Sequence, residues 1–138
     1  MRKGSAMSQI DESLLEFNDD DLLVFEGKPY TGETFLNYAG GNIKRAMSYD
    51  NGLPSGCCKE WYESGQLKRE WLAVRSQGAS EEKQYYENGV TLSIRLTEHN
   101  IETSYEKYNE SGELVEQRKL EANSPMAKVL ERMRNVHA

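Results

Sequence analysis

A chain of 138 residues, 37% of them hydrophobic, with a mean hydropathy of −0.81, is most simply one domain with a small core. No stretch approaches the roughly 18 apolar residues of a membrane-spanning helix, so we expect no membrane partner. The net charge of −6 makes nucleic acid a poor partner, because binding to phosphate requires basic contacts.

The first 21 residues are predicted to form an acidic N-terminal segment. Between Gly4 and Gly27 there is no Lys or Arg. The same window holds seven acids: Asp11, Glu12, Glu16, Asp19, Asp20, Asp21 and Glu26. The rest of the chain therefore sums to +1. Two interpretations are open: a solvated, solubilising segment, or an anionic face that docks a basic protein.

Residues 8–17 allow two local structures. The stretch SQIDESLLEF fits either a short helix capped by Asp11 or Ser13, or an irregular strand. Leu22–Phe25 predicts a first strand before the turn GKPYTG. Residues 1–12 include two basic side chains but no apolar stretch, so we expect no secretory signal there. Either Met1 or Met7 can be the start.

Glycine-centred turns recur at a fixed interval through the middle of the chain. Steps of 24, 24 and 23 residues separate Gly41, Gly65, Gly89 and Gly112. A second kind of turn ends at Gly32 and at Gly56, again 24 residues apart. Glycine at such positions supplies the positive φ of a tight hairpin turn. The regular spacing predicts a repeated β-hairpin unit.

We therefore predict a mainly β fold, an elongated, twisted antiparallel sheet of hairpin repeats over residues 22–120. The predicted strand pairs are Thr34–Tyr38 with Ile43–Tyr49, Cys57–Tyr62 with Leu67–Val74, Lys83–Tyr86 with Leu92–Leu96, and Ile101–Tyr108 with Leu114–Leu120. Along residues 67–73, alternation places Leu67, Arg69, Trp71 and Ala73 on one face. Trp61 is expected to pair across the hairpin with the Leu67–Trp71 side of that strand.

A helix is predicted in the last region, residues 121–138. Ser124 is a suitable N-cap and Pro125 suits the first helical position. An apolar face at helical spacing consists of Met126, Val129, Leu130 and Met133. We expect this helix to cap the last sheet edge, because an uncovered edge strand invites unwanted pairing.

The pattern is an aromatic pair, an acid, Asn or Ser, then Gly-x-Leu-Lys-x-Glu, followed by a Tyr or Trp and a Gly-rich bend. It resembles the MORN-like repeats of bacterial antitoxins of the YwqK kind. The stretches that match best are Phe25–Gly56 and CCKEWYESGQLKRE, residues 57–70; weaker copies extend the resemblance over residues 22–120. The resemblance implies the hairpin-repeat fold. It also implies an immunity protein or antitoxin that binds and silences a cognate toxin.

The later copies depart from the pattern. After Gly89 the aliphatic residue comes one place late, at Leu92, and residues 79–81 lack the Pro and Gly of the earlier bend. The fourth copy has an extra residue between Tyr108 and Gly112. These departures leave the strand register after Gly78 open.

Residues suited to catalysis or metal binding are sparse. His99 and His137 have no Cys or carboxylate at metal-ligand spacing, and Gly40-Gly41 suits a hairpin turn better than a phosphate-binding loop. Cys57 and Cys58 are neighbours on a predicted strand and point to opposite faces, so we expect one buried and one exposed thiol in a reducing compartment. We expect no enzyme activity, no cofactor and no bound metal.

Three functions remain open for a chain of this kind. A cytoplasmic immunity protein that blocks a basic, nuclease-like toxin is favoured over a MORN-type scaffold or adaptor, and both over an unrecognised hydrolase. We expect the chain to act as a monomer or as a 1:1 heterodimer with the toxin. The predicted partner-binding residues are Asp19, Asp20, Asp21, Glu26, Tyr62 and Trp71.

Overall fold

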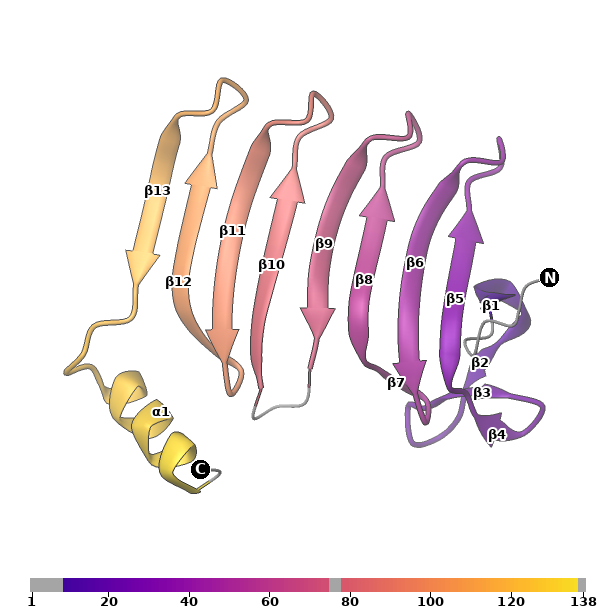
Figure 1. The fold of residues 1–138 in the computed structure, drawn as a ribbon, viewed down its shortest axis with the longest axis horizontal. Helices are drawn as coiled ribbons and strands as arrows, with labels where there is room; N and C mark the ends of the chain where they lie inside the picture. Colours follow the sequence, from indigo (N-terminus) through magenta and orange to yellow (C-terminus); the bar gives the residue numbers. More distant parts are fainter. Residues whose placement is uncertain (1–8, 75–77, 137–138) are drawn as a thin grey trace.

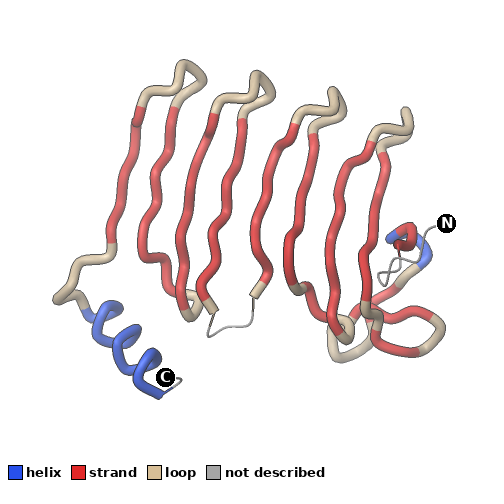
Figure 2. Tube along the Cα trace, viewed as in Figure 1, coloured by secondary structure: helices blue, strands red, loops and turns tan. Residues whose placement is uncertain are grey.

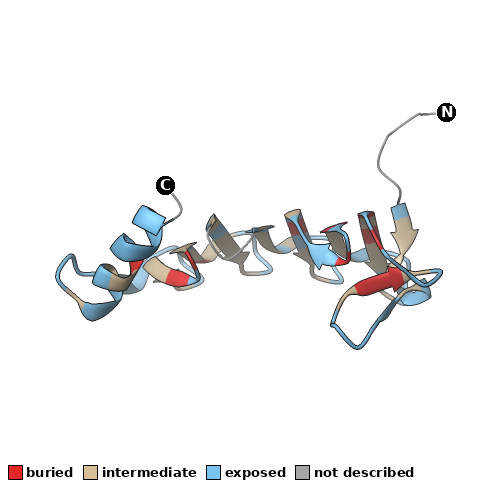
Figure 3. Cartoon of the chain, turned by 90° about the horizontal axis from the view of Figure 1, so that it is seen from below, coloured by how far each residue is buried: buried red, intermediate tan, exposed pale blue. Residues whose placement is uncertain are grey.

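The computed structural model describes residues 9–74 and 78–136, so the alternative starts Met1 and Met7, and His137, lie outside the described residues. It contains one ten-stranded sheet, one three-stranded sheet and a single α-helix in that part of the chain. The large sheet is an elongated single layer, with the helix beside one end and the small sheet at the other (Figures 1 and 3). The predicted mainly β fold is confirmed.

The hairpins lie side by side in chain order, as Figures 1 and 2 show. The eight strands that form them are β5 (Gly32–Asn37), β6 (Ile43–Asp50), β8 (Gly56–Trp61), β9 (Leu67–Ala73), β10 (Ala79–Tyr85), β11 (Thr91–Glu98), β12 (Ile101–Tyr108) and β13 (Leu114–Lys119). Each of these eight strands pairs antiparallel with the next, and the short β7 (Leu53–Pro54) pairs with β6. The four predicted strand pairs are thus present, with β10 and β11 longer than predicted.

All four hairpins share one register. A bulge near the turn brings together Asn37 and Ile43, Trp61 and Leu67, Tyr85 and Thr91, and Tyr108 and Leu114. Gly41, Gly65, Gly89 and Gly112 have φ values of 102°, 98°, 91° and 88°. The bulge interrupts the strict alternation predicted from Leu67 onwards, because Leu67 is displaced by one place and lies opposite Trp61.

This register answers the question left open after Gly78 and corrects one interpretation of the later copies. Thr91, not Leu92, takes the place of Leu67, so the strand is not displaced and only the residue type differs. The fourth turn contains no extra residue: Gly112 donates its N–H to the carbonyl of Asn109, as Gly65 does to that of Tyr62. Asn109 therefore occupies the position that a tyrosine holds in the first three turns.

Those three tyrosines join each hairpin to the next. The hydroxyl of Tyr38 donates to the carbonyl of Trp61 at 2.6 Å, that of Tyr62 to Tyr85 at 2.7 Å, and that of Tyr86 to Tyr108 at 2.8 Å. Because each bond spans one repeat, the tyrosine explains part of the sequence period. Asn109 has no later hairpin to reach, and its Oδ1 instead accepts from the N–H groups of Ser111 and Glu113, both at 3.0 Å.

The hydrophobic core lies at the N-terminal end of the sheet. It is centred on Leu23, Tyr30 and Tyr49, with Ile10, Leu15, Phe25 and Met47 packed around them. The small sheet that supplies part of it consists of β2 (Glu16–Phe17), β3 (Leu23–Phe25) and β4 (Lys28–Pro29). Farther along the large sheet most residues are half-buried or exposed (Figure 3). A single layer cannot bury both of its faces.

Residues 9–17 contain elements of both predicted kinds. β1 (Gln9–Asp11) pairs parallel with β5, and the 3₁₀ turn η1 (Glu12–Leu14) follows. Asp11 caps that turn, since its Oδ1 accepts the N–H of Ser13 at 2.9 Å. This parallel pairing is a long-range contact, and no local sequence pattern indicates it.

The C-terminal helix α1 (Pro125–Val136) begins as predicted but does not cover the sheet edge. Ser124 caps it, with Oγ accepting the N–H of Ala127 at 3.2 Å. Of the predicted apolar face only Leu130 is buried, whereas Met126 and Met133 are 48% and 36% exposed. All residues of β13 stay exposed, because the helix lies beside the end of the strands (Figure 1).

Candidate protein-binding surfaces

The predicted acidic residues are exposed on two turns of the small sheet. Asp19, Asp20 and Asp21 form the turn between β2 and β3. Asn18 shapes this turn, because its Oδ1 accepts the N–H groups of Asp20 at 2.9 Å and Leu22 at 3.0 Å. Glu26 lies on the next turn, with a φ of 53°. The carboxylates thus project from an ordered support.

Two apolar side chains stand out in the same segment. Leu14 is 68% exposed and Phe17 is 62% exposed, and Phe17 immediately precedes the aspartate turn. Neither is among the partner-binding residues predicted from the sequence. Their position among the acidic residues could have indicated them. In the sequence, however, these apolar residues were explained as part of a short helix or strand.

Tyr62 and Trp71 lie on the repeats and are already engaged within the chain. Tyr62 donates its hydroxyl to Tyr85, and burial, with Glu87 nearby, raises its pKa. Trp71 is half-buried under the guanidinium of Arg69, 3.9 Å from the ring centroid. The structure does not bring these two residues together with the aspartates, because β5 and β6 lie between β8 and the small sheet (Figure 1). Their role in partner binding stays a prediction.

One face of the large sheet carries a chain of alternating charges, which we name the charge ladder. From β8 to β13 it consists of Glu60, Arg69, Glu82, Arg95, Glu102, Arg118 and Glu116. Arg69 contacts Glu60 at 3.7 Å and Glu82 at 2.5 Å. Farther along, Arg95 contacts Glu82 at 3.3 Å and Glu102 at 3.1 Å. The ladder links every strand from β8 to β13 without an apolar core.

Aromatic rings reinforce the ladder. The guanidinium groups of Arg95 and Arg118 lie 4.8 and 4.2 Å from the ring centroid of Tyr105. The two arginines hydrogen-bond Glu102 and lower the pKa of its carboxyl, with Arg118 the larger cause. Each arginine thus has both an anionic and an aromatic neighbour. We interpret the main role of this face as stabilising the sheet, since its charged groups form ion pairs with one another.

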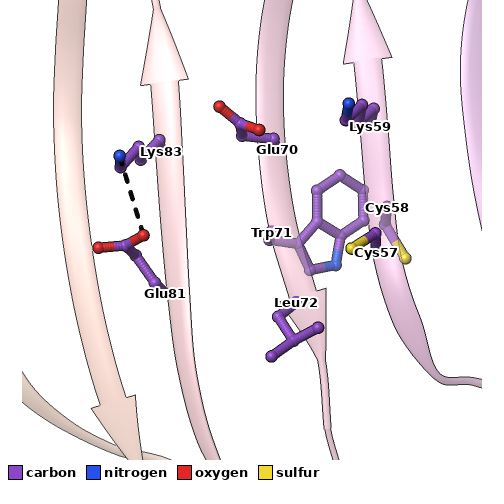
Figure 4. A pocket seen from close by; sticks show the side chains of 8 residues that line it. All are labelled: Cys57, Cys58, Lys59, Glu70, Trp71, Leu72, Glu81 and Lys83. Carbon is purple, nitrogen blue, oxygen red and sulfur yellow. Dashed lines mark ion pairs between the residues drawn. The ribbon is translucent and has the colours of Figure 1, made fainter.

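A hollow of about 270 Å³ lies over β8, β9 and β10 (Figure 4). Its lining consists of Cys57, Cys58, Lys59, Glu70, Trp71, Leu72, Glu81 and Lys83. Lys83 lies 3.9 Å from Glu81. Glu70 accepts the hydroxyl of Tyr85; burial and this carboxylate together raise the pKa of that phenol to about 12. The lining combines apolar side chains with lysines and glutamates, so it suits an apolar side chain of a partner that carries charge beside it.

The two cysteines behave as predicted. Cys57 is exposed, Cys58 is buried, and both are free thiols. Burial raises the pKa of the Cys58 thiol, so this group is held neutral and unreactive. Among residues 9–74 and 78–136, no three His, Cys, Asp or Glu side chains are arranged to hold a metal ion. In the same ranges no helix is long and apolar enough to span a membrane.

Comparison with known families identifies one of the repeats. The family described as MORN repeat variant matches residues 54–72, which run from β7 through the hairpin of β8 and β9 nearly to its end. No curated protein is significantly similar to the chain. The matched hairpin shares its register and turn geometry with the other three, so the chain carries at least one MORN repeat variant within an array of structurally equivalent hairpins.

Proposed function

We propose that this protein is a cytoplasmic immunity protein that neutralises a basic toxin by direct binding, one toxin per chain, and that it acts without catalysis or cofactor. The observation that carries the proposal is the exposed Phe17 beside three exposed aspartates on one ordered turn. Affinity in protein interfaces comes mainly from a few desolvated aromatic anchors, whereas surrounding charges accelerate encounter. The resemblance to YwqK-type antitoxins supplies the specific role, and two free thiols fit a reducing compartment.

An acidic inhibitor suits a basic target for a physical reason. A toxin that acts on nucleic acid presents a basic surface to its substrate, and an acidic protein is attracted to that same surface. Asp19, Asp20, Asp21 and Glu26 would face the basic residues of the toxin, with Leu14 and Phe17 buried between the partners. Binding there would exclude the substrate.

The test is association kinetics against the toxin encoded beside this gene, at low and high salt. The variant D19N/D20N/D21N should associate more slowly and with a flatter salt dependence than the parent. The control E63Q/E87Q/E110Q removes three exposed acids from the other turns and changes the net charge equally. If both triple variants associate equally fast at low salt and both protect cells from the toxin, the acidic turn is only a solvated segment.

A second candidate is a structural scaffold or adaptor, favoured by the match of residues 54–72 to the MORN repeat variant. The open faces of the sheet, including the hollow over β8–β10, would then hold a partner that is not a toxin. A growth assay distinguishes the two candidate functions. A scaffold leaves cells sensitive to the neighbouring gene product, whereas an immunity protein rescues them.

A further inference from the structure

The outer strand of the large sheet has an open edge. β13 is the last strand in the sheet order, and each of its six residues is exposed. Helix α1 leaves it uncovered, and in the described ranges no strand lies on its far side. An edge strand of this length presents unpaired backbone groups that can extend the sheet with another chain.

The backbone direction of that edge follows from one hydrogen bond. Leu120 donates its N–H to the carbonyl of Thr103 on β12 at 3.0 Å. Along an extended strand the N–H groups alternate in direction, so those of Lys119 and Gln117 point away from β12. Gln117 therefore lies at the middle of the available edge.

The side chains of β13 are complementary to a second copy of themselves. Glu116 and Arg118 lie opposite Lys107 and Tyr105 of β12 and belong to the charge ladder, on one face of the sheet. A two-fold axis through Gln117 places Glu116 opposite Arg118 of the second copy, and Arg118 opposite its Glu116. Moving the axis to Glu116 or to Arg118 places like charges opposite each other, which destabilises a strand pair.

From this arrangement we propose that the protein forms a symmetric dimer in which β13 pairs antiparallel with β13 of a second copy about Gln117. The charge ladder then continues across the two-fold axis from one chain into the other. The repeat array itself ends here, because Asn109 replaces the tyrosine that would hold a further hairpin. Closure by a two-fold axis satisfies the edge without such a hairpin. The proposal is independent of the immunity role.

The interface is small, since two six-residue strands bury less surface than a standard protein interface. We therefore expect dimerisation that depends on concentration, with a dissociation constant in the micromolar range or above. Sedimentation equilibrium from low micromolar to millimolar protein measures it directly. The parent should rise from the mass of one chain towards twice that mass.

Charge reversal tests the register. Glu116→Arg and Arg118→Glu should each weaken dimerisation by at least about tenfold, because each turns two attractive contacts into repulsive ones. An equimolar mixture of the two variants should dimerise again, since every contact between them is attractive. The double variant E116R/R118E should also recover dimerisation. Lys59→Glu, an exposed reversal on β8, is the matched control and should leave the dimer intact.

Folding is checked by circular dichroism. Arg118→Glu loses its hydrogen bonds to Glu102; if it fails to fold, Glu116→Gln and Glu116→Arg form a graded pair, with the larger loss expected for Arg. A parent that remains monomeric throughout the concentration range would overturn the proposal and leave the edge charges as protection against pairing. A dimer that ignores the charge at residues 116 and 118 would place the contact elsewhere.

Discussion

At the scale of single residues, a tyrosine connects each hairpin to the next. Its ring lies on one hairpin and its hydroxyl donates a hydrogen bond to the following one. The acceptor is a main-chain carbonyl in each of the three cases. A carbonyl that loses its donor in a half-buried site costs free energy unless water replaces the bond. A tyrosine is therefore required at this position for stability, independently of any binding partner.

Replacing Tyr62 with Phe should lower the free energy of unfolding by about 1 kcal/mol, because the carbonyl of Tyr85 loses its donor while the ring packing is kept. Asn109→Tyr should not stabilise the protein, since it removes the two turn bonds of Asn109 and has no following hairpin to reach. Urea denaturation measures both. Unchanged stability of Tyr62→Phe would show that the inter-hairpin bond is not significant for folding.

At the scale of elements, the hairpins could be predicted from the sequence, whereas the position of the C-terminal helix could not. A turn is specified by a few consecutive residues, so the glycine spacing was enough to place all four hairpins. The position of helix α1 depends on Leu130 and on a pair of hydrogen bonds, 2.6 and 2.7 Å, from Arg134 to Glu98 in β11. That contact joins residues 36 apart, and the amphipathic pattern of the helix alone does not identify its partner.

Leu130→Ala should therefore destabilise the docked helix by about 2 kcal/mol or more, because Leu130 is only 3% exposed. Met126→Ala, on the same helix but 48% exposed, should change stability by less than about 0.5 kcal/mol. Hydrogen exchange of the helix amides should be accelerated by the first substitution alone. Equal exchange in both variants would contradict the docking described for α1.

At the scale of the whole molecule, stability comes from ladders along a thin sheet and from a small core at one end. The charge ladder has a partial signal in the sequence: Arg69 follows a turn glycine by four residues, and Arg95 and Arg118 each follow one by six. Apart from Glu116, their glutamate partners come from neighbouring strands, and the register that brings them together is known only from the fold. The acidic segment could be predicted because composition alone reveals it. The exposure of Leu14 and Phe17 could not, because it depends on how the segment folds.

In the proposed function, the exposed apolar residues beside the aspartate turn anchor the toxin. The most direct measurement is the dissociation constant of the toxin complex for Phe17→Ser, with growth protection measured in parallel. The control is Val136→Ser, which changes a 77% exposed apolar residue at the end of α1. We predict that Phe17→Ser weakens binding by at least about tenfold and reduces protection, while Val136→Ser changes neither. Parental affinity and full protection in Phe17→Ser would contradict the anchoring role of this side chain.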